Sequence, residues 1–189
     1  VLTKSAAGND WGVYHKNADA TAPEDYAFKF NTTAIRADQV AMWNDTQPTS
    51  TLVSIGTDGR ANDSGVMVAW CFTGIQGFSK FGQYKGNGNT DGPFVFTGFR
   101  PALIITKDAD GLAGNWNMWS NKIKGYNPQE AMLTTNQDAI VQDKDIDILS
   151  NGFKPRDAGQ SNENNSTYIY MAWAESPFCN SNGVPTNAR

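Results

Sequence analysis

The chain has 189 residues, of which 39% are hydrophobic and only 18% are charged, and its formal net charge is −4. This composition excludes a disordered, charge-driven chain, and the scattered basic residues exclude the clustered phosphate-binding surface of a nucleic-acid partner. No apolar run approaches the ~18–20 residues that cross a bilayer, so we expect no membrane partner either.

Glycine, asparagine, aspartate, threonine and serine are abundant, and 12% of the residues are aromatic. Polar turn formers combined with aromatic residues favour many short strands over helices. Period-two alternation predicts strands, in chain order, at 11–15, 27–31, 52–55, 66–72, 80–85, 94–97, 102–107, 116–120, 147–149 and 168–174. Short helical turns are expected only within 33–43 and 136–143. The predicted fold is all-β, a jelly-roll-like β-sandwich with few or no helices.

The stretch GNGNTDG at 86–92 follows Lys85 and resembles a phosphate-binding loop. A phosphate-binding loop continues into a helix whose amide groups face the anion, whereas PFVF follows here and reads as a strand. Asn-Gly and Asp-Gly supply the positive φ angles of tight turns. The sequence therefore predicts a hairpin turn between two strands.

Five sequence blocks recur in the same order about 103–105 residues apart. Lys4 corresponds to Lys107, Trp11 to Trp116 and Trp70 to Trp173. We therefore predict two related repeats, 1–77 and 78–179, followed by a tail at 180–189. The first repeat has no counterpart of the opening strands at 80–85 and 94–97. The region before Lys4 is accordingly expected to lie at a sheet edge or to continue into further chain.

Chemically reactive residues are few. His15 is the only histidine, and strand alternation predicts a surface or edge position for it rather than a catalytic one. Cys71 and Cys179 have no metal-ligand spacing and are expected to be reduced thiols. Aspartates at 58, 63, 108 and 110 lie in turns that calcium could use, but Asx residues favour turns without a metal. We expect no metal and no cofactor.

Three residues are candidates for ligand or receptor contact. The recurring tryptophans most simply fill equivalent core positions, which leaves Trp43 and Trp119 less constrained. Trp43 is the better candidate for an exposed ring that stacks on a sugar. Glu175 lies beside Trp173 and is the most interesting carboxylate for glycoside chemistry, which needs two acidic groups. A solvated carboxylate at a strand end is the simpler interpretation, so no catalytic residue is assigned.

Several blocks also resemble a repeated domain of tailed-bacteriophage virion proteins, common in phages of marine bacteria. They are WGVYHKN, WNDTQPTS, the run from VAWCF to ALIITK, DIDILSNGFK, TYIYMAWAESPF and NSNGVPTNAR. The resemblance implies a β-rich component of the virion and no known active site. Its expected function is a structural or adhesion module of a tail fibre or spike, homo-oligomeric with a trimer favoured. Its expected partners are other virion proteins and a host-surface glycan or receptor.

Three alternatives remain open at this point. A capsid decoration or head-fibre protein would use the same scaffold within the virion. A carbohydrate-active depolymerase would need a second carboxylate near Glu175. A secreted lectin, like a receptor-binding tip, would expose Trp43 or another aromatic residue in a concave site. The tail-fibre or spike module is the primary hypothesis, and its distinction from a decoration protein depends on the location in the particle rather than on the sequence.

Overall fold

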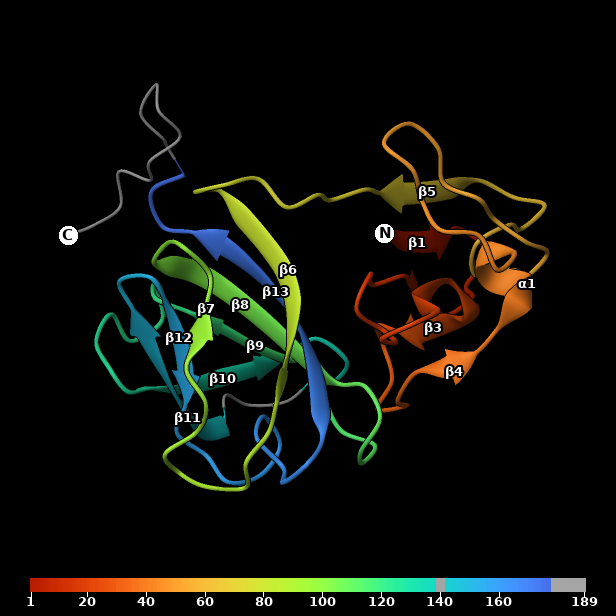
Figure 1. Ribbon diagram of the computed structural model, residues 1–189. Helices are drawn as coiled ribbons and strands as arrows, with labels where there is room; N and C mark the ends of the chain where they lie inside the picture. Colours follow the sequence, from red (N-terminus) through yellow and green to blue (C-terminus); the bar gives the residue numbers. More distant parts are fainter. Residues whose placement is uncertain (139–141, 178–189) are drawn as a thin grey trace. The chain divides into compact units, whose positions relative to one another are not determined.

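The computed structural model describes residues 1–138 and 142–177. The chain divides into two compact units, Val1–Phe72 and Thr73–Arg189 (Figure 1). Nearly all of the regular structure is antiparallel β-sheet, so the predicted all-β, sandwich-like fold is confirmed. The boundary between the units lies after Phe72, whereas the repeat pattern placed it after residue 77.

Unit 1 is a five-stranded antiparallel sheet in the order β4-β3-β2-β1-β5. Two short helical turns accompany it. The elements are β1 (Leu2–Ser5), β2 (Gly12–Val13), η1 (Pro23–Asp25), β3 (Tyr26–Lys29), β4 (Ala37–Asp38), α1 (Val40–Trp43) and β5 (Met67–Trp70).

The core of unit 1 forms where α1 packs against the sheet. Trp43 and Met42 are fully buried and contact a cluster that contains Tyr14, Ala27 and Ala61. The Trp43 ring meets Tyr14 edge-on at 5.9 Å, an arrangement that aromatic quadrupoles favour. α1 lies within the helical turn expected at 33–43 and ends at Asn44, which has a left-handed φ of 53°.

Unit 2 is an eight-stranded antiparallel sheet in the order β6-β13-β8-β9-β10-β11-β12-β7. Strands β8 to β12 form a meander, and β13 returns to lie between β8 and β6. The elements are β6 (Ser79–Lys85), β7 (Val95–Phe96), β8 (Pro101–Asp108), β9 (Asn117–Ser120), β10 (Gln129–Thr134), β11 (Gln142–Leu149), β12 (Gly152–Pro155) and β13 (Thr167–Ala174).

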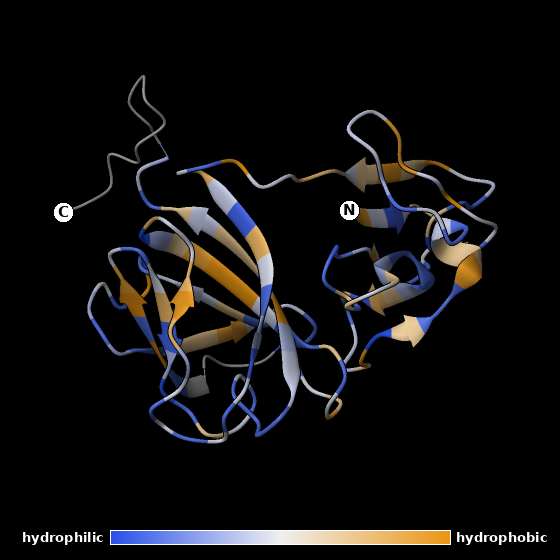
Figure 2. Cartoon of the chain, viewed as in Figure 1, coloured by the Kyte–Doolittle hydropathy of each residue, from blue (hydrophilic) through white to orange (hydrophobic). Residues whose placement is uncertain are grey.

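The two edge strands of this sheet approach each other. Lys80 of β6 donates from Nζ to the carbonyl of Phe96 in β7 at 2.8 Å, and its ammonium lies over the Phe96 ring. The sheet therefore curls almost into a barrel around one apolar core (Figure 1). That core contains Tyr84, Ile104, Trp119, Phe153 and Tyr168. Much of β8, which runs through it, is strongly hydrophobic (Figure 2).

The units share one sheet design. β1, β2 and β3 correspond to β8, β9 and β10 with the same pairing partners. Equivalent hydrogen bonds also recur: Asn31 Oδ1 accepts from Trp11 N at 3.0 Å, and Asn136 Oδ1 accepts from Trp116 N at 2.9 Å. Lys4 donates to the Asn9 carbonyl, as Lys107 does to the Gly114 carbonyl.

The structure corrects the alignment of the last strand. Ala6 N donates to Val66 O in unit 1, and Ala109 N donates to Thr167 O in unit 2. These bonds make Val66 equivalent to Thr167 and Trp70 equivalent to Met171, so the pairing of Trp70 with Trp173 is wrong by two residues. A slip of two keeps side chains on the same face of a strand, which is why the sequence pattern did not reveal it.

The sheet-edge alternative for the region before Lys4 is wrong. β1, which carries Lys4, lies inside the sheet between β2 and β5, so the region around it is not the edge. The edge strand is β5. In unit 2 the equivalent strand, β13, is covered by β6, and no strand of described unit 1 has that role.

The GNGNTDG stretch is not a hairpin. β6 before it pairs with β13, and β7 after it pairs with β12, so the loop crosses between the two edges of the sheet. Asn162 holds the loop: its side chain bonds Asn87 N at 3.0 Å and the Asn89 carbonyl at 2.7 Å. Glycine is needed at Gly86 because a Cβ there would overlap the Glu163 carbonyl. The glycines therefore serve close backbone approach.

Two further differences concern strands. The strand expected at 52–55 is absent, because this segment forms a turn in which Thr49 Oγ1 accepts from Leu52 N at 3.0 Å. Leu52 is accordingly 69% exposed. Conversely, β1, β4, β10 and β12 were not expected. β4 lies where a helical turn was expected, and the polar and glycine residues of β10 and β12 mask the alternation. The helical turn expected at 136–143 falls partly outside the described residues.

Candidate functional site

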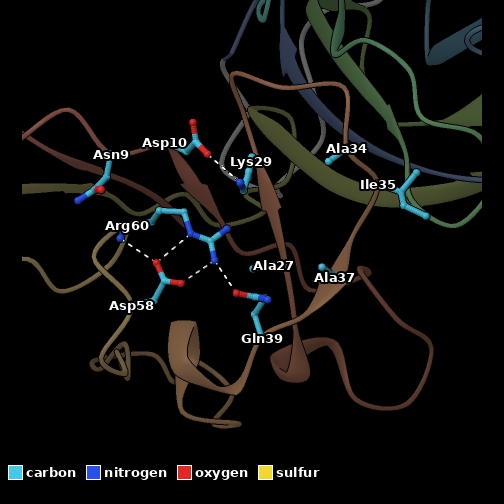
Figure 3. Close-up of a pocket in the computed structure, with 10 residues that line it drawn as sticks. All are labelled: Asn9, Asp10, Ala27, Lys29, Ala34, Ile35, Ala37, Gln39, Asp58 and Arg60. Atoms are coloured by element: carbon cyan, nitrogen blue, oxygen red, sulfur yellow. Dashed lines mark hydrogen bonds and ion pairs between the residues drawn. The ribbon is translucent and has the colours of Figure 1, made fainter.

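Unit 1 contains a polar pocket of about 390 Å³ (Figure 3). Its lining comes from β3, β4, the turn before β2, and the 58–60 segment. The lining residues are Asn9, Asp10, Ala27, Lys29, Ala34, Ile35, Ala37, Gln39, Asp58 and Arg60.

The sheet brings these residues together from four places in the chain. β2 pairs with β3 so that Gly12 lies opposite Lys29, which places Asp10 beside the Lys29 side chain. Arg60 is positioned by its backbone, because its carbonyl accepts from Thr3 Oγ1 at 2.8 Å. The pocket therefore depends on the β2–β3 pairing and on the hydrogen bond that ties Arg60 to Thr3 of β1.

Two ion pairs dominate the pocket. Lys29 Nζ lies 2.8 Å from Asp10 Oδ2, and Arg60 forms two bonds to the Asp58 carboxylate, from Nε at 2.8 Å and from NH2 at 2.7 Å. The same guanidinium donates to Gln39 Oε1 at 2.6 Å. Bidentate arginine–carboxylate pairs fix orientation as well as charge.

The hydrogen bonds keep both carboxylates ionised. The bond from Lys29, supported by Asn31, lowers the pKa of Asp10 below its usual range. The Arg60 guanidinium likewise lowers the pKa of Asp58, and this contact raises the pKa of Arg60. Neither carboxyl group therefore has the raised pKa that a general acid needs near neutral pH.

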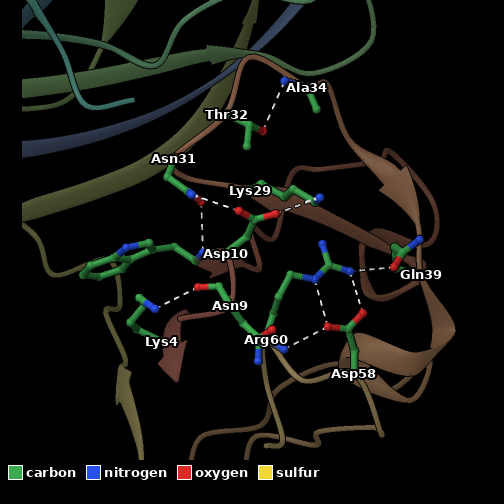
Figure 4. A network of polar contacts seen from close by, with 11 residues as sticks. Lys4, Asn9, Asp10, Lys29, Asn31, Thr32, Ala34, Gln39, Asp58 and Arg60 are labelled. Carbon is green, nitrogen blue, oxygen red and sulfur yellow. Dashed lines mark hydrogen bonds and ion pairs between the residues drawn. The ribbon is translucent and has the colours of Figure 1, made fainter. Parts of the chain in front are cut away.

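A wider network supports the pocket (Figure 4). Asn31 Nδ2 donates to Asp10 Oδ1 at 2.9 Å, and Lys4 Nζ donates to the Asn9 carbonyl at 2.8 Å. Asn9 in turn donates to the Gly59 carbonyl at 3.1 Å. These bonds tie the turn before β2 to the loop that carries Asp58 and Arg60, which fixes the geometry of the pocket.

The charges of the pocket cancel in pairs. Two cationic and two anionic side chains face it, and each cation has its carboxylate. A phosphate or carboxylate ligand would have to displace an internal partner, at the cost of an unpaired charge. Neutral ligands with many hydroxyl groups can instead share the remaining donors and acceptors of the asparagine, glutamine and carboxylate groups.

The chain matches a known protein family. The family model described as "Domain of unknown function (DUF7483)" matches residues 1–177. The chain belongs to the DUF7483 family. No curated protein and no solved structure matches it.

In this member of the DUF7483 family, the two predicted tryptophan contacts are wrong. Trp43 and Trp119 are both 0% exposed. Trp43 is buried because α1 turns it into the core of unit 1, and Trp119 lies on the inner face of β9 and donates from Nε1 to the Lys144 carbonyl at 2.9 Å. Neither ring offers a face to a sugar.

Glu175 lies just after β13 and forms ion pairs. Its Oε2 accepts from Arg100 Nε at 2.9 Å, and its Oε1 lies 3.4 Å from Lys122 Nζ. Within the described ranges, its charged partners are cations, and no carboxylate contact to it is seen. Glu175 therefore holds two strand ends together, and the arrangement does not resemble a glycosidase pair.

The structure also corrects the position of His15. It is buried at 4% exposure, where Asn17 N donates to its Nδ1 at 3.1 Å. Cys71 is exposed and reduced, and Cys179 lies outside the described residues. The turn aspartates serve as backbone caps, as when Asp108 accepts from Gly111 N at 2.7 Å.

Residues 1–138 and 142–177 contain no cluster of three or more acidic, cysteine or histidine side chains that could hold a metal ion. Nor does this part of the chain contain a helix with the length and apolar character needed to cross a membrane.

An aromatic pair that sequence reasoning assigned to the core is partly exposed. Trp11 and Trp70 stack at 5.5 Å with an interplanar angle of 17°, and Trp70 is 39% exposed. Of the four recurring tryptophans, only Trp116 is fully buried. The signal available in the sequence was that the first repeat lacks the strand that would cover Trp70.

Proposed function

We propose that this chain is a structural and adhesion module of a bacteriophage virion, part of a tail fibre or spike that contacts the host surface. The resemblance of its sequence blocks to virion proteins motivates the location. The pocket of unit 1 supplies the adhesion site of the proposal. Its ligand is a neutral, hydroxyl-rich glycan that hydrogen bonds hold without ring stacking, since none of the lining residues is aromatic.

The observation that carries the glycan assignment is the charge balance of the pocket. Asp10, Lys29, Asp58 and Arg60 are paired, and Gln39 is held by Arg60. Fixed planar polar groups recognise sugar hydroxyls by several hydrogen bonds at once, and pre-orientation reduces the entropy lost on binding. No catalytic step is assigned to these groups.

The glycan assignment is tested by binding to an array of bacterial surface glycans. We expect wild-type protein to bind at least one neutral glycan and Gln39→Ala and Lys29→Gln to weaken that binding at least tenfold. Lys144→Gln is the matched control, because it breaks a similar ion pair, to Asp157 at 2.9 Å, in unit 2. Equal binding by all variants would reject the pocket as the site.

The virion assignment has a separate test. Peptide mapping of purified phage particles, followed by cryo-EM localisation, should find the chain in the tail fibre or spike. Detection in the capsid shell would replace the proposal with a decoration or head-fibre role. Absence from every particle would remove the virion proposal altogether.

A further inference from the structure

The equivalent strands β5 of unit 1 and β13 of unit 2 have different neighbours. In unit 2, β13 lies between β8 and β6, and its residues Ile169 and Tyr170 are buried at 0% and 3% exposure. Their equivalents in unit 1 are Val68, which is 45% exposed, and Ala69, which is also exposed. The same sheet position is therefore covered in one unit and open in the other.

The open edge of β5 has backbone groups that point away from the sheet. Val66 O accepts from Ala6 N, so Val66, Val68 and Trp70 direct their backbone groups towards β1. Successive residues in an antiparallel ladder face opposite sides. Met67 and Ala69 therefore present their N–H and C=O groups at the edge.

This edge lacks the features that normally block strand addition. No charged residue occurs between Asp63 and Lys80, and Val66, Trp70 and Phe72 are 72%, 39% and 49% exposed. Edge strands that stay unpaired usually carry lysine, proline or a bulge. An uncharged, apolar edge is instead suited to β-augmentation, in which an extended segment adds to the sheet.

Unit 2 shows what such a segment looks like. β6 pairs antiparallel with β13, with Tyr84 opposite Tyr168 and Phe81 opposite Met171. β6 thus brings one aromatic side chain to each face of the sheet beside β13, because Tyr84 lies in the core and Phe81 lies on the opposite face. Transferred to β5, the same register places an aromatic residue opposite Trp70 and another opposite Met67, where thioether–aromatic contact is favourable.

We propose that the open edge of β5 binds an extended strand of the β6 type from a further repeat of this family. The strand lies antiparallel to β5, in the register that β6 takes on β13. It covers Val68 and Ala69 as β6 covers Ile169 and Tyr170. This interaction is independent of the glycan pocket.

One position distinguishes β5 from β13 as a docking site. A Cβ on Gly82 of β6 would lie 2.7 Å from Tyr170 Oη, so β13 requires glycine there. On β5 the equivalent of Tyr170 is Ala69, which leaves room for a side chain. A β6 peptide with Gly82→Val should therefore still bind β5, although it does not fit β13.

The test uses the full chain and capped synthetic peptides that span residues 78–86. Binding is followed by titration, and its place by hydrogen exchange of the 64–72 segment. We expect both the parent and the Gly82→Val peptide to protect this segment, with the valine peptide binding at least as tightly.

Backbone methylation of the peptide provides the matched control. Gly86 N donates to Ser166 O, so even-numbered residues of β6 direct their backbone groups towards the partner strand. N-methylation at Tyr84 should weaken binding to β5 at least tenfold, whereas N-methylation at Gln83 should leave it nearly unchanged. Equal effects of the two methyl groups would contradict strand pairing.

Three outcomes would overturn the proposal. The first is that neither peptide protects residues 64–72. The second is that only the parent peptide binds and that it replaces β6 on β13. The third is that the chain without peptide is a dimer by light scattering with 64–72 already protected. In that case a second copy of β5 occupies the edge.

Discussion

Trp43 and Trp119 have different surroundings although both are buried. Trp43 and Trp119 are equally buried, yet only Trp119 has a hydrogen-bond partner for Nε1 among the described residues. A buried N–H without a partner is costly, and removing it recovers part of that cost. The two positions therefore respond differently to the same substitution.

We predict that Trp119→Phe destabilises the protein by about 1 kcal/mol more than Trp43→Phe, because only the former leaves a carbonyl, that of Lys144, without its donor. Urea unfolding of both variants and the wild type measures the difference. Equal losses, or a larger loss for Trp43→Phe, would show that the two N–H groups have equivalent surroundings.

Lys107 is a buried cation in unit 2. Burial lowers the pKa of Lys107 to about 8, and its Nζ donates to the Gly114 carbonyl at 2.6 Å. Below about pH 8 the folded state carries the full desolvation penalty of the charge. Between about pH 8 and the ordinary lysine range near 10.4 the folded state binds fewer protons than the unfolded state, so stability rises with pH.

We predict that the free energy of unfolding rises between pH 8 and 10 because of Lys107, and that Lys107→Met removes this rise. The full effect is as much as about 3 kcal/mol. Burial raises the pKa of Tyr84 and of Tyr170, which lowers stability only above about pH 10. These two tyrosines therefore do not contribute to the change between pH 8 and 10. Lys4→Met, at the equivalent half-buried position, is the control. A pH slope that survives Lys107→Met would contradict this account.

At the scale of elements, the repeat could be read from the sequence but its register could not. Lys4, Trp11 and their partners align because their hydrogen bonds recur in both units. Trp70 aligned with Trp173 only by residue type. Strand alternation fixes the face of a residue and not its partner, so an error of two positions is invisible until the hydrogen bonds are known.

The shared asparagines give a test of the repeat. We predict that Asn136→Ala costs about 1–2 kcal/mol, because it leaves the part-buried backbone N–H of Trp116 without its acceptor, and that Asn31→Ala costs about 0.5–1 kcal/mol, because water can reach the Trp11 N–H. Thermal or urea unfolding measures both losses. A cost for one variant and none for the other would mean that the two bonds are not equivalent parts of one design.

The glycine-rich loop shows why turn signals can mislead. Asn-Gly and Asp-Gly occur in hairpins, but here the flanking strands pair with β13 and β12, which are distant in sequence. The local sequence carries no information on those partners. What it did encode is the need for glycine where the Asn162 region approaches the loop backbone.

We predict that Gly86→Ala destabilises unit 2 by about 1–3 kcal/mol or more, because the new Cβ overlaps the Glu163 carbonyl. Gly114→Ala is the control, since the nearest atom to its Cβ would be 3.8 Å away. Urea midpoints of the two variants decide the matter. Similar tolerance of both substitutions would show that the loop can move away from Glu163.

For the whole molecule, the fold class followed from composition and alternation, while the site did not. The pocket collects Asp10, Lys29, Gln39 and the Asp58–Arg60 pair from separate elements, with no motif at fixed spacing. Only the pairing of β2 with β3 and the packing of the 56–60 loop bring them together. The predicted exposure of Trp43 was likewise wrong, because α1 turns the Trp43 ring into the core of unit 1.

The central claim is that both units share one sheet design and that unit 1 leaves the β5 edge open. Residue-resolved hydrogen exchange of the wild-type chain tests it most directly. The amides of Met67 and Ala69 should exchange quickly while those of Val68 and Trp70 are protected by β1; in β13, both alternating sets should be protected. Protection of Met67 and Ala69 as strong as that of Tyr168 and Tyr170, in the monomeric chain, would contradict the account.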